Sequence, residues 1–171
     1  MEAEVLDLGM IKNCFASFLL PLSVVFAAAP KVSNQHAGTK VVGNSWNIPA
    51  VNKGEILALF DDWNNALKPG DPKKVSALYS SEAILLPTLS NRVRHNHAEI
   101  EDYFVHFLAK VPEGVINEAN VRIHDSIAIN SGVYTFTFAN GTSARARFTF
   151  VYAWNGTAWE IIEHHSSQMP E

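Results

Sequence analysis

The sequence has few of the residues on which several classes of protein depend. Its 171 residues include a single cysteine, Cys14, which excludes an intramolecular disulfide framework and a cysteine-rich zinc site. The 13 Lys and Arg residues are outnumbered by 17 Asp and Glu, giving a formal charge of -4, so we expect no nucleic acid partner. No Gly-rich phosphate loop, G-x-S-x-G elbow or H-E-x-x-H motif is present. We therefore expect neither a cofactor nor a metal ion.

One long apolar run stands near the N-terminus. Residues 11–29 combine a basic residue, Lys12, with an apolar centre and an Ala-rich end, which is typical of a secretory signal peptide. The acidic residues before this run favour Met10 as the true start. We expect residues 1–29 to direct export to the periplasm or the medium, with no membrane contact after cleavage. The alternative is a membrane anchor formed by residues 11–29, because the run approaches the ~20 residues that span a bilayer.

The rest of the chain predicts a linker followed by one domain. Residues 30–51 lack periodicity and are typical of a linker or mobile arm, and the domain occupies residues 52–171. Asn52 with Glu55 resembles a capping box before a helix over residues 53–67. Further helices are expected after Asp71 and after Asn96, with a buried strand at 83–87 and a polar loop at 88–96. Period-two patterns then predict strands near 116–125, 126–138, 144–153 and 158–166. This order indicates an α+β domain with helices packed on one face of an antiparallel sheet.

The last hairpin predicts which side chains share a face of the sheet. A two-residue Asn155-Gly156 turn would place Phe150 opposite Ile161 and Arg147 opposite His164. Phe148, Phe150, Tyr152, Trp159 and Ile161 would then form one apolar face, with Arg145, Arg147, His164 and Ser166 on the other. For the preceding hairpin two registers stay open: Tyr134 opposite Arg147, or opposite Phe148.

The C-terminal segment EHHSS, residues 163–167, concentrates groups that catalyse or bind. His164 and His165 point to opposite faces of a regular strand, so a metal site that uses both would need a bulge. A serine nucleophile is disfavoured because no sharp turn presents the hydroxyl groups. Glu163 or His165 is a candidate general base. Arg94, Arg145 and Arg147 are candidates for binding a small anion, the alternative being surface salt bridges.

Several segments together resemble a known family. LLPTLSN, ARFTFVY and HHSSQMP, within residues 53–170, are similar to the nuclear transport factor 2-like superfamily. Within it the chain resembles the association (hub) domain of calcium/calmodulin-dependent protein kinase type II and its stand-alone bacterial relatives, which are often labelled oxidoreductases. The resemblance implies a cone-shaped, cystatin-like α+β fold around a pocket, homodimers or larger rings, and no kinase activity. Two pocket arginines of hub domains align with Thr135 and Thr149 here, so the resemblance supports an anion site only in part.

These observations favour an exported, oligomeric domain that binds a small molecule, with a small anion as one candidate. The candidate ligand-binding residues are Asn91, Arg94, Tyr103, Arg147, Glu163, His164 and His165. Two alternatives stay open. One is a small enzyme, an isomerase, hydrolase or oxidoreductase, that uses Glu163 or a histidine as general base, and the other is a purely structural oligomerisation module.

Overall fold

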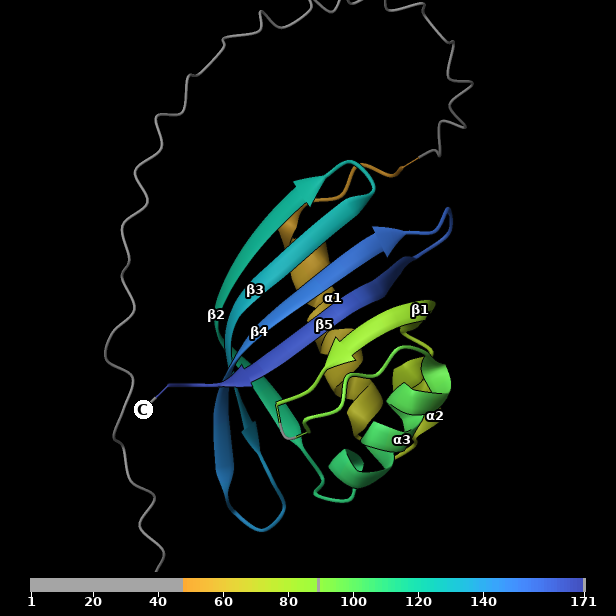
Figure 1. The fold of residues 1–171 in the computed structure, drawn as a ribbon. Helices are drawn as coiled ribbons and strands as arrows, with labels where there is room; N and C mark the ends of the chain where they lie inside the picture. Colours follow the sequence, from red (N-terminus) through yellow and green to blue (C-terminus); the bar gives the residue numbers. More distant parts are fainter. Residues whose placement is uncertain (1–47, 89, 171) are drawn as a thin grey trace, which may run out of the picture. The chain divides into compact units, whose positions relative to one another are not determined.

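The computed structural model describes residues 48–88 and 90–170 (Figure 1). The expected leader at 1–29 and most of the linker at 30–51 lie outside the described residues. The described elements are α1 (Lys53–Leu67), α2 (Pro72–Ser76), β1 (Tyr79–Leu86), α3 (His97–Leu108), β2 (Glu113–His124), β3 (Ile127–Thr137), β4 (Ser143–Trp154) and β5 (Trp159–Gln168). Among the residues that the structure describes, no helix is both long and apolar enough to cross a membrane.

The helices begin where local side chains can satisfy the free backbone amides. The Asn52 side chain accepts hydrogen bonds from Gly54 and Glu55, and the Glu55 carboxylate binds the Asn52 amide in return, which confirms the predicted capping box. The side chains of Asp71 and Asn96 cap α2 and α3 by accepting one amide hydrogen bond each, from Lys73 and Glu99, without the reciprocal bond of a capping box. The starts of all three helices confirm the sequence prediction because their signals are local. The second helix is shorter than expected: Tyr79, which was expected on its buried face, is the first residue of β1, so this strand begins before the expected 83.

The sheet has the strand order β1-β5-β4-β3-β2 (Figure 1). Four of the strands form an antiparallel meander, whereas β1 pairs with β5 in parallel, so the sheet is mixed rather than wholly antiparallel as expected. The helices cover one face, which we call the core face. There the aromatic rings of α1 and α3 meet those of β3 and β4 in one apolar core. The expected α+β architecture is confirmed.

The last hairpin does not have the predicted register. The Asn155 amide bonds the Ala158 carbonyl, so the two central turn residues are Gly156 and Thr157 rather than Asn155 and Gly156. The Asn155 side chain stabilises this turn by accepting the amides of Thr157 and Ala158. Tyr152 consequently lies opposite Ile161, and Ile162 forms a bulge before Glu163 pairs with Val151.

The bulge changes the face of the strand end. After it, His164 lies opposite Phe150 and Ser166 opposite Phe148, both on the core face. The prediction that His164 and Ser166 share the Arg147 face was therefore wrong. Arg147 lies opposite Ser167 instead.

The preceding hairpin adopts neither of the two expected registers. Tyr134 lies opposite Ala146. The loop has three residues, Ala139 to Gly141, closed by a hydrogen bond from the Phe138 amide to the Thr142 carbonyl. Gly141 has a φ of 79°, a left-handed conformation that favours glycine and suits the third position of such a loop.

Candidate functional site

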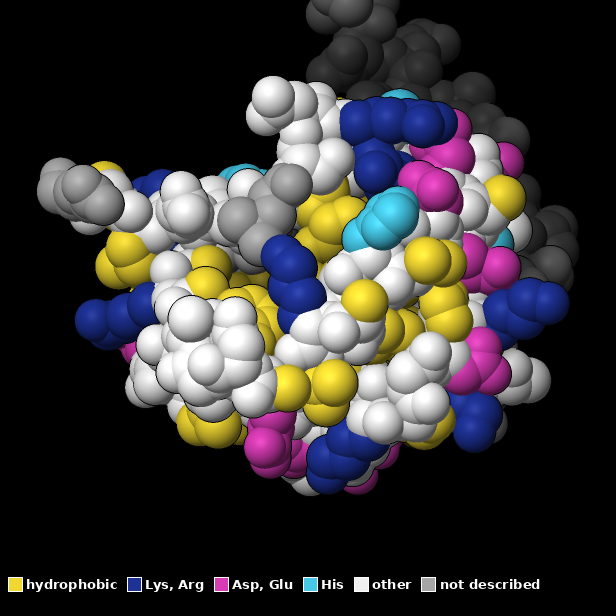
Figure 2. All heavy atoms as spheres, turned by 90° about the horizontal axis from the view of Figure 1, so that it is seen from below, with side chains coloured by type: hydrophobic (Ala, Val, Ile, Leu, Met, Phe, Trp, Pro, Cys, Tyr) yellow, Lys and Arg dark blue, Asp and Glu magenta, His cyan; other side chains and the backbone are white. Residues whose placement is uncertain are grey.

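A pocket lies on the core face, between α3, the start of β4 and the end of β5. Its volume is about 460 Å³. Seen from below in Figure 2, apolar side chains form a recess with basic side chains near its edge. The lining residues are Trp63, Leu85, Pro87, Thr88, Tyr103, Phe104, Phe107, Tyr134, Phe136, Phe138, Ser143, Ala144, Arg145, Ala146, His164, Ser166, Gln168, Met169 and Pro170. Seven of these 19 residues are Trp, Tyr or Phe, so aromatic rings supply much of the apolar wall, and hydroxyl groups, His164 and Arg145 supply the polar part.

His164 is the most constrained polar group of this wall. Its side chain is buried, with 3% exposure, and its ring stacks on Phe150 at a centroid distance of 4.0 Å. The edge of the Trp63 ring packs against it at 5.4 Å. Burial, aided by the neighbouring His165, lowers the pKa of His164 to about 3. The imidazole is therefore neutral at physiological pH.

The proton of this neutral imidazole has a defined position. Trp63 Nε1 donates to the Tyr79 hydroxyl at 3.1 Å, and the same hydroxyl lies 2.9 Å from His164 Nδ1. An indole N–H can only donate, so the tyrosine oxygen accepts from Trp63. We assign the tyrosine's own proton to the bond with Nδ1, because no other acceptor for it lies among the described residues. His164 then carries its proton on Nε2. Nε2 is buried and has no hydrogen-bond partner among the described residues. A buried donor without a partner costs about 1–3 kcal/mol.

A chain of hydroxyl groups forms a second polar part of the wall. Tyr134 donates to Ser166 Oγ at 2.6 Å, and Ser166 also contacts the Thr88 hydroxyl. Burial raises the pKa of Tyr134 well above its ordinary value, so its hydroxyl stays protonated. This chain joins the end of β1, the middle of β3 and the end of β5. The sequence analysis missed Tyr134 and Thr88, because only the folded sheet brings these distant segments together.

The structure distributes the predicted ligand-binding residues over several places. Tyr103 and His164 line the pocket. Arg94 is buried next to it, with its guanidinium 5.9 Å from the Tyr103 ring. Asn91 is exposed on the loop before α3. The structure therefore brings three of the seven residues to one region of the domain.

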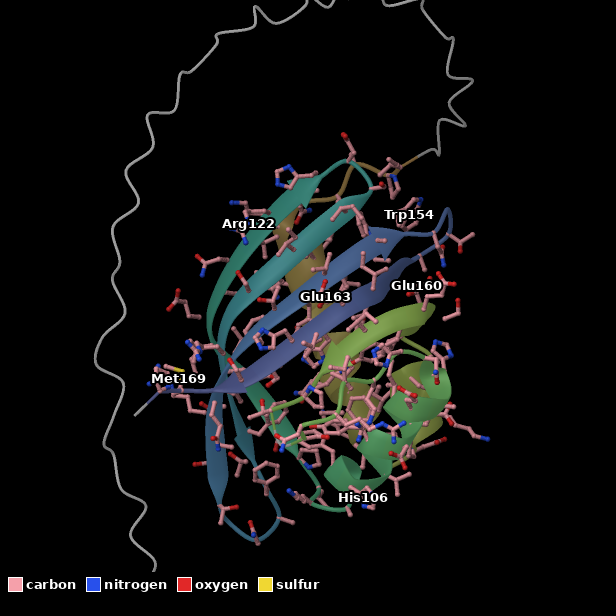
Figure 3. All side chains as sticks on the ribbon, viewed as in Figure 1. His106, Arg122, Trp154, Glu160, Glu163 and Met169 are labelled. Carbon is pink, nitrogen blue, oxygen red and sulfur yellow. The ribbon has the colours of Figure 1, made fainter. Side chains whose placement is uncertain are left out.

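The remaining three predicted residues lie on the outer face of the sheet, opposite the helices. Arg147, Glu163 and His165 are exposed, and Figure 3 shows Glu163 on β5 with α1 behind the sheet. The candidate general bases Glu163 and His165 are thus separated from the pocket by the sheet itself. Within the described residues, no three His, Cys, Asp or Glu side chains gather closely enough to hold a metal ion.

Comparison with known proteins matches this fold and sequence to one family. Residues 52–170 match the family model described as calcium/calmodulin dependent protein kinase II association domain. The chain belongs to this family. A candidate association domain from Xanthomonas campestris is 50% identical, with a TM-score of 0.67 over 72% of this chain and 93% of that chain. No curated protein matches the sequence.

More distant solved structures share only the fold of this association domain. An NTF2-like protein from Pseudomonas putida is 15% identical, with a TM-score of 0.61 over 69% of this chain and 87% of that one. A candidate ketosteroid isomerase from Parabacteroides distasonis is 16% identical, with a TM-score of 0.58 over 72% of this chain and 92% of that one. The expected NTF2-like, cystatin-like fold is confirmed.

Proposed function

We propose that this association domain binds a small molecule with a hydrogen-bond acceptor, such as a carboxylate, in the pocket next to His164. The observation that carries the proposal is the buried Nε2–H of His164, which has no partner among the described residues. A ligand acceptor that bonds this group would remove the cost of leaving it unpaired. The aromatic wall would bury the apolar part of the ligand, as in most small-molecule sites.

The other polar groups of the wall fit the same ligand. Ser166, Thr88 and Tyr103 carry hydroxyl groups, and Arg145 adds a positive charge. Neutral His164 is a poor base because its pKa is about 3, so this wall supports binding an acceptor better than abstracting a proton. The enzymatic alternative with Glu163 or His165 as base would need a separate site on the outer face.

A thermal-shift screen against small aliphatic and aromatic carboxylates tests the proposal. We expect at least one to raise the melting temperature, and His164→Asn, which has no nitrogen at the Nε2 position, to weaken its binding about 2- to 10-fold, the worth of one hydrogen bond. His165→Gln and Arg147→Ala, both on the outer face, should bind like wild type. The proposal fails if no carboxylate shifts the melting temperature, or if the outer-face variants lose binding while His164→Asn keeps it.

We also propose that copies of the domain associate through the outer face of the sheet. Ile129 lies opposite Val151 on this face, and both are half-buried apolar side chains, as is Val133 on the same strand as Ile129. The family description of an association domain supports a homodimer or a larger ring. Light scattering should show an oligomer that Val151→Asp dissociates, since a carboxylate would be buried in the interface. A monomeric wild-type protein would contradict this proposal.

Export completes the proposed function. The signal-like segment at 11–29 supports cleavage after Ala29 and release into the periplasm or the medium. Mass spectrometry of the protein from its native host should then find a chain that begins at Pro30. A full-length chain recovered with the membrane fraction would instead support the anchor.

A further inference from the structure

A second, smaller pocket lies beside the main one, between α3 and the loop that precedes it. Its volume is about 290 Å³, and its lining residues are Ser90, Arg94, Tyr103, His106, Phe107 and Lys110. Tyr103 and Phe107 also line the main pocket, so their stacked rings separate the two spaces. Arg94 and Lys110 carry positive charge, whereas none of the described lining residues is Asp or Glu.

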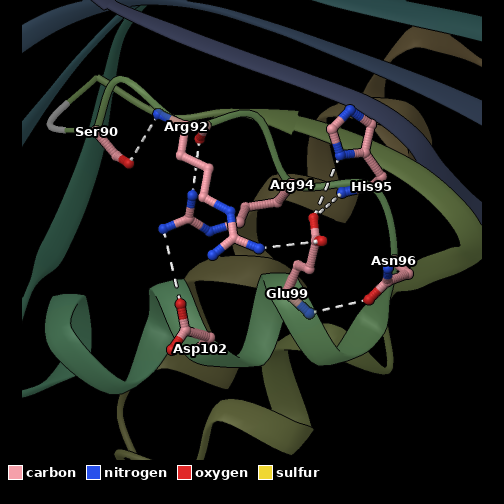
Figure 4. A network of polar contacts seen from close by, with 7 residues as sticks. All are labelled: Ser90, Arg92, Arg94, His95, Asn96, Glu99 and Asp102. Atoms are coloured by element: carbon pink, nitrogen blue, oxygen red, sulfur yellow. Dashed lines mark hydrogen bonds and ion pairs between the residues drawn. The ribbon is translucent and has the colours of Figure 1, made fainter.

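Arg94 is a buried cation with few partners. The residue is 7% exposed, and its backbone is held by two hydrogen bonds with Leu85, each of 2.9 Å. Its guanidinium makes one hydrogen bond with the described residues, from Nη1 to the Arg92 carbonyl at 2.9 Å (Figure 4). Nε is buried without a partner among them. A guanidinium has five N–H donors, so most donors of Arg94 have no hydrogen-bond partner among the described residues, although the side chain is buried from water.

The neighbouring carboxylates accept no hydrogen bond from the Arg94 guanidinium. The Glu99 carboxylate accepts hydrogen bonds from the His95 amide at 2.9 Å and from the Arg92 guanidinium at 3.2 Å. The bond from the His95 amide is the main cause of the lowered pKa of Glu99. Asp102 lies 3.8 Å from Arg94 Nη2, beyond hydrogen-bond distance, on a side chain that is 58% exposed (Figure 4). Arg94 therefore keeps an incompletely paired charge at the edge of the small pocket.

We propose that the small pocket binds an oxyanion, either a carboxylate or a phosphate group, with Arg94 as its anchor. Two oxygen atoms of such an anion match the planar fork of a guanidinium, which favours oxyanions over a spherical ion. Burial and the Leu85 hydrogen bonds hold Arg94 in place before the anion arrives, so little side-chain freedom is lost on binding. Lys110, which is exposed, adds charge at the rim, and the exposed imidazole of His106 adds a polar ring there.

The proposal is tested by titrating inorganic phosphate, and separately acetate, into the full domain at low ionic strength while backbone amide resonances are followed by NMR. We expect saturable shifts at Ser90, Arg94 and Lys110 with at least one of the two anions. Sodium chloride at the same ionic strength should give no saturable change, because chloride lacks the paired oxygen atoms. The comparison of the two anions shows whether phosphate or carboxylate is preferred.

Variants distinguish the contribution of the Arg94 guanidinium to anion binding from the contribution of positive charge alone. Arg94→Lys keeps the charge but loses the fork, and should weaken binding about tenfold. Lys110→Gln should weaken anion binding about 2- to 5-fold. If Arg94→Lys does not fold, the Lys110→Gln variant alone tests whether the anion binds in the small pocket. Lys74→Gln, an exposed lysine on α2, and His164→Gln in the main pocket should both leave anion affinity unchanged. The inference is wrong if wild type shows no saturable binding, or if Lys110→Gln and Arg94→Lys bind like wild type.

Discussion

The Nδ1 atom of His164 lies 2.9 Å from the hydroxyl of Tyr79, deep in the core of the domain. This contact joins the start of β1 to the end of β5, two strands that pair in parallel. Trp63 on α1 completes it by donating to the same hydroxyl. A helix, an edge strand and the last strand thus together determine which nitrogen of His164 carries the proton.

Burial of His164 predicts a loss of stability in acid. The unfolded side chain has a pKa near 6.5 and the folded one near 3, so between these values the unfolded state binds a proton that the folded state does not. The free energy of unfolding should therefore fall as the pH decreases below about 6.5, by up to ~1.4 kcal/mol per pH unit. Urea denaturation at several pH values measures this slope.

Two variants isolate the contribution of His164 to that slope. His164→Gln cannot titrate, so its stability should change less with pH between about 6.5 and 4 than that of wild type. His165→Gln removes only the smaller of the two causes that lower the pKa of His164, so this variant should keep most of the wild-type slope. Equal slopes for wild type and His164→Gln would show that His164 is not held neutral in the folded state.

The hydrogen bond from Tyr134 on β3 to Ser166 on β5 predicts that substitutions of these two residues have non-additive effects on stability. Tyr134→Phe and Ser166→Ala should each lower the free energy of unfolding by about 1 kcal/mol, because Ser166→Ala leaves the buried Tyr134 hydroxyl unpaired and Tyr134→Phe removes one of the two hydroxyl contacts of Ser166. The double variant should lose less than the sum, with a coupling of about 0.5 kcal/mol or more. Tyr134→Phe combined with Thr157→Ala, at the exposed turn, provides the additive control. Additivity of the first pair would mean that the hydroxyl contact contributes nothing to stability.

The position of Gly132 on β3 leaves no room for a side chain. A Cβ atom there would lie 1.8 Å from the Glu118 carbonyl oxygen, next to the irregularity in the pairing of β2 with β3. Gly132→Ala should lower the free energy of unfolding by about 3 kcal/mol, since backbone must move to admit the methyl group. Gly70→Ala has open space around it and only an unfavourable φ of 70°, so we expect a loss of about 1 kcal/mol. Similar losses for both variants in chemical denaturation would contradict the steric account.

The helices could be predicted from the sequence because their signals are local. Asn52 and Glu55 define the start of α1 within four residues, and Asn96 does the same for α3. The strands could be located by their alternation, but their pairing could not. Ile162, which forms the bulge in β5, is a half-buried apolar residue that fits either face, so the alternation gives no sign of it.

That one bulge explains why the candidate site was only partly predictable. The sequence selects His164 and Tyr103, but a regular strand would have turned His164 toward the outer face with Arg147. The parallel pairing of β1 with β5 also depends on contacts between residues far apart in the chain. The contacts of His164 with Tyr79 and Trp63 exist only once both features are in place, so no short motif encodes them.

The most direct test of the account is the protonation state of His164, observed by long-range ¹H–¹⁵N NMR of histidine-labelled protein at about pH 5, where an ordinary histidine is mostly charged. The account predicts a neutral ring with its proton on Nε2 and an unprotonated Nδ1, and an Nε2 resonance that moves when a carboxylate from the screen binds. A charged His164 ring at this pH, or a neutral ring with its proton on Nδ1, would contradict the account.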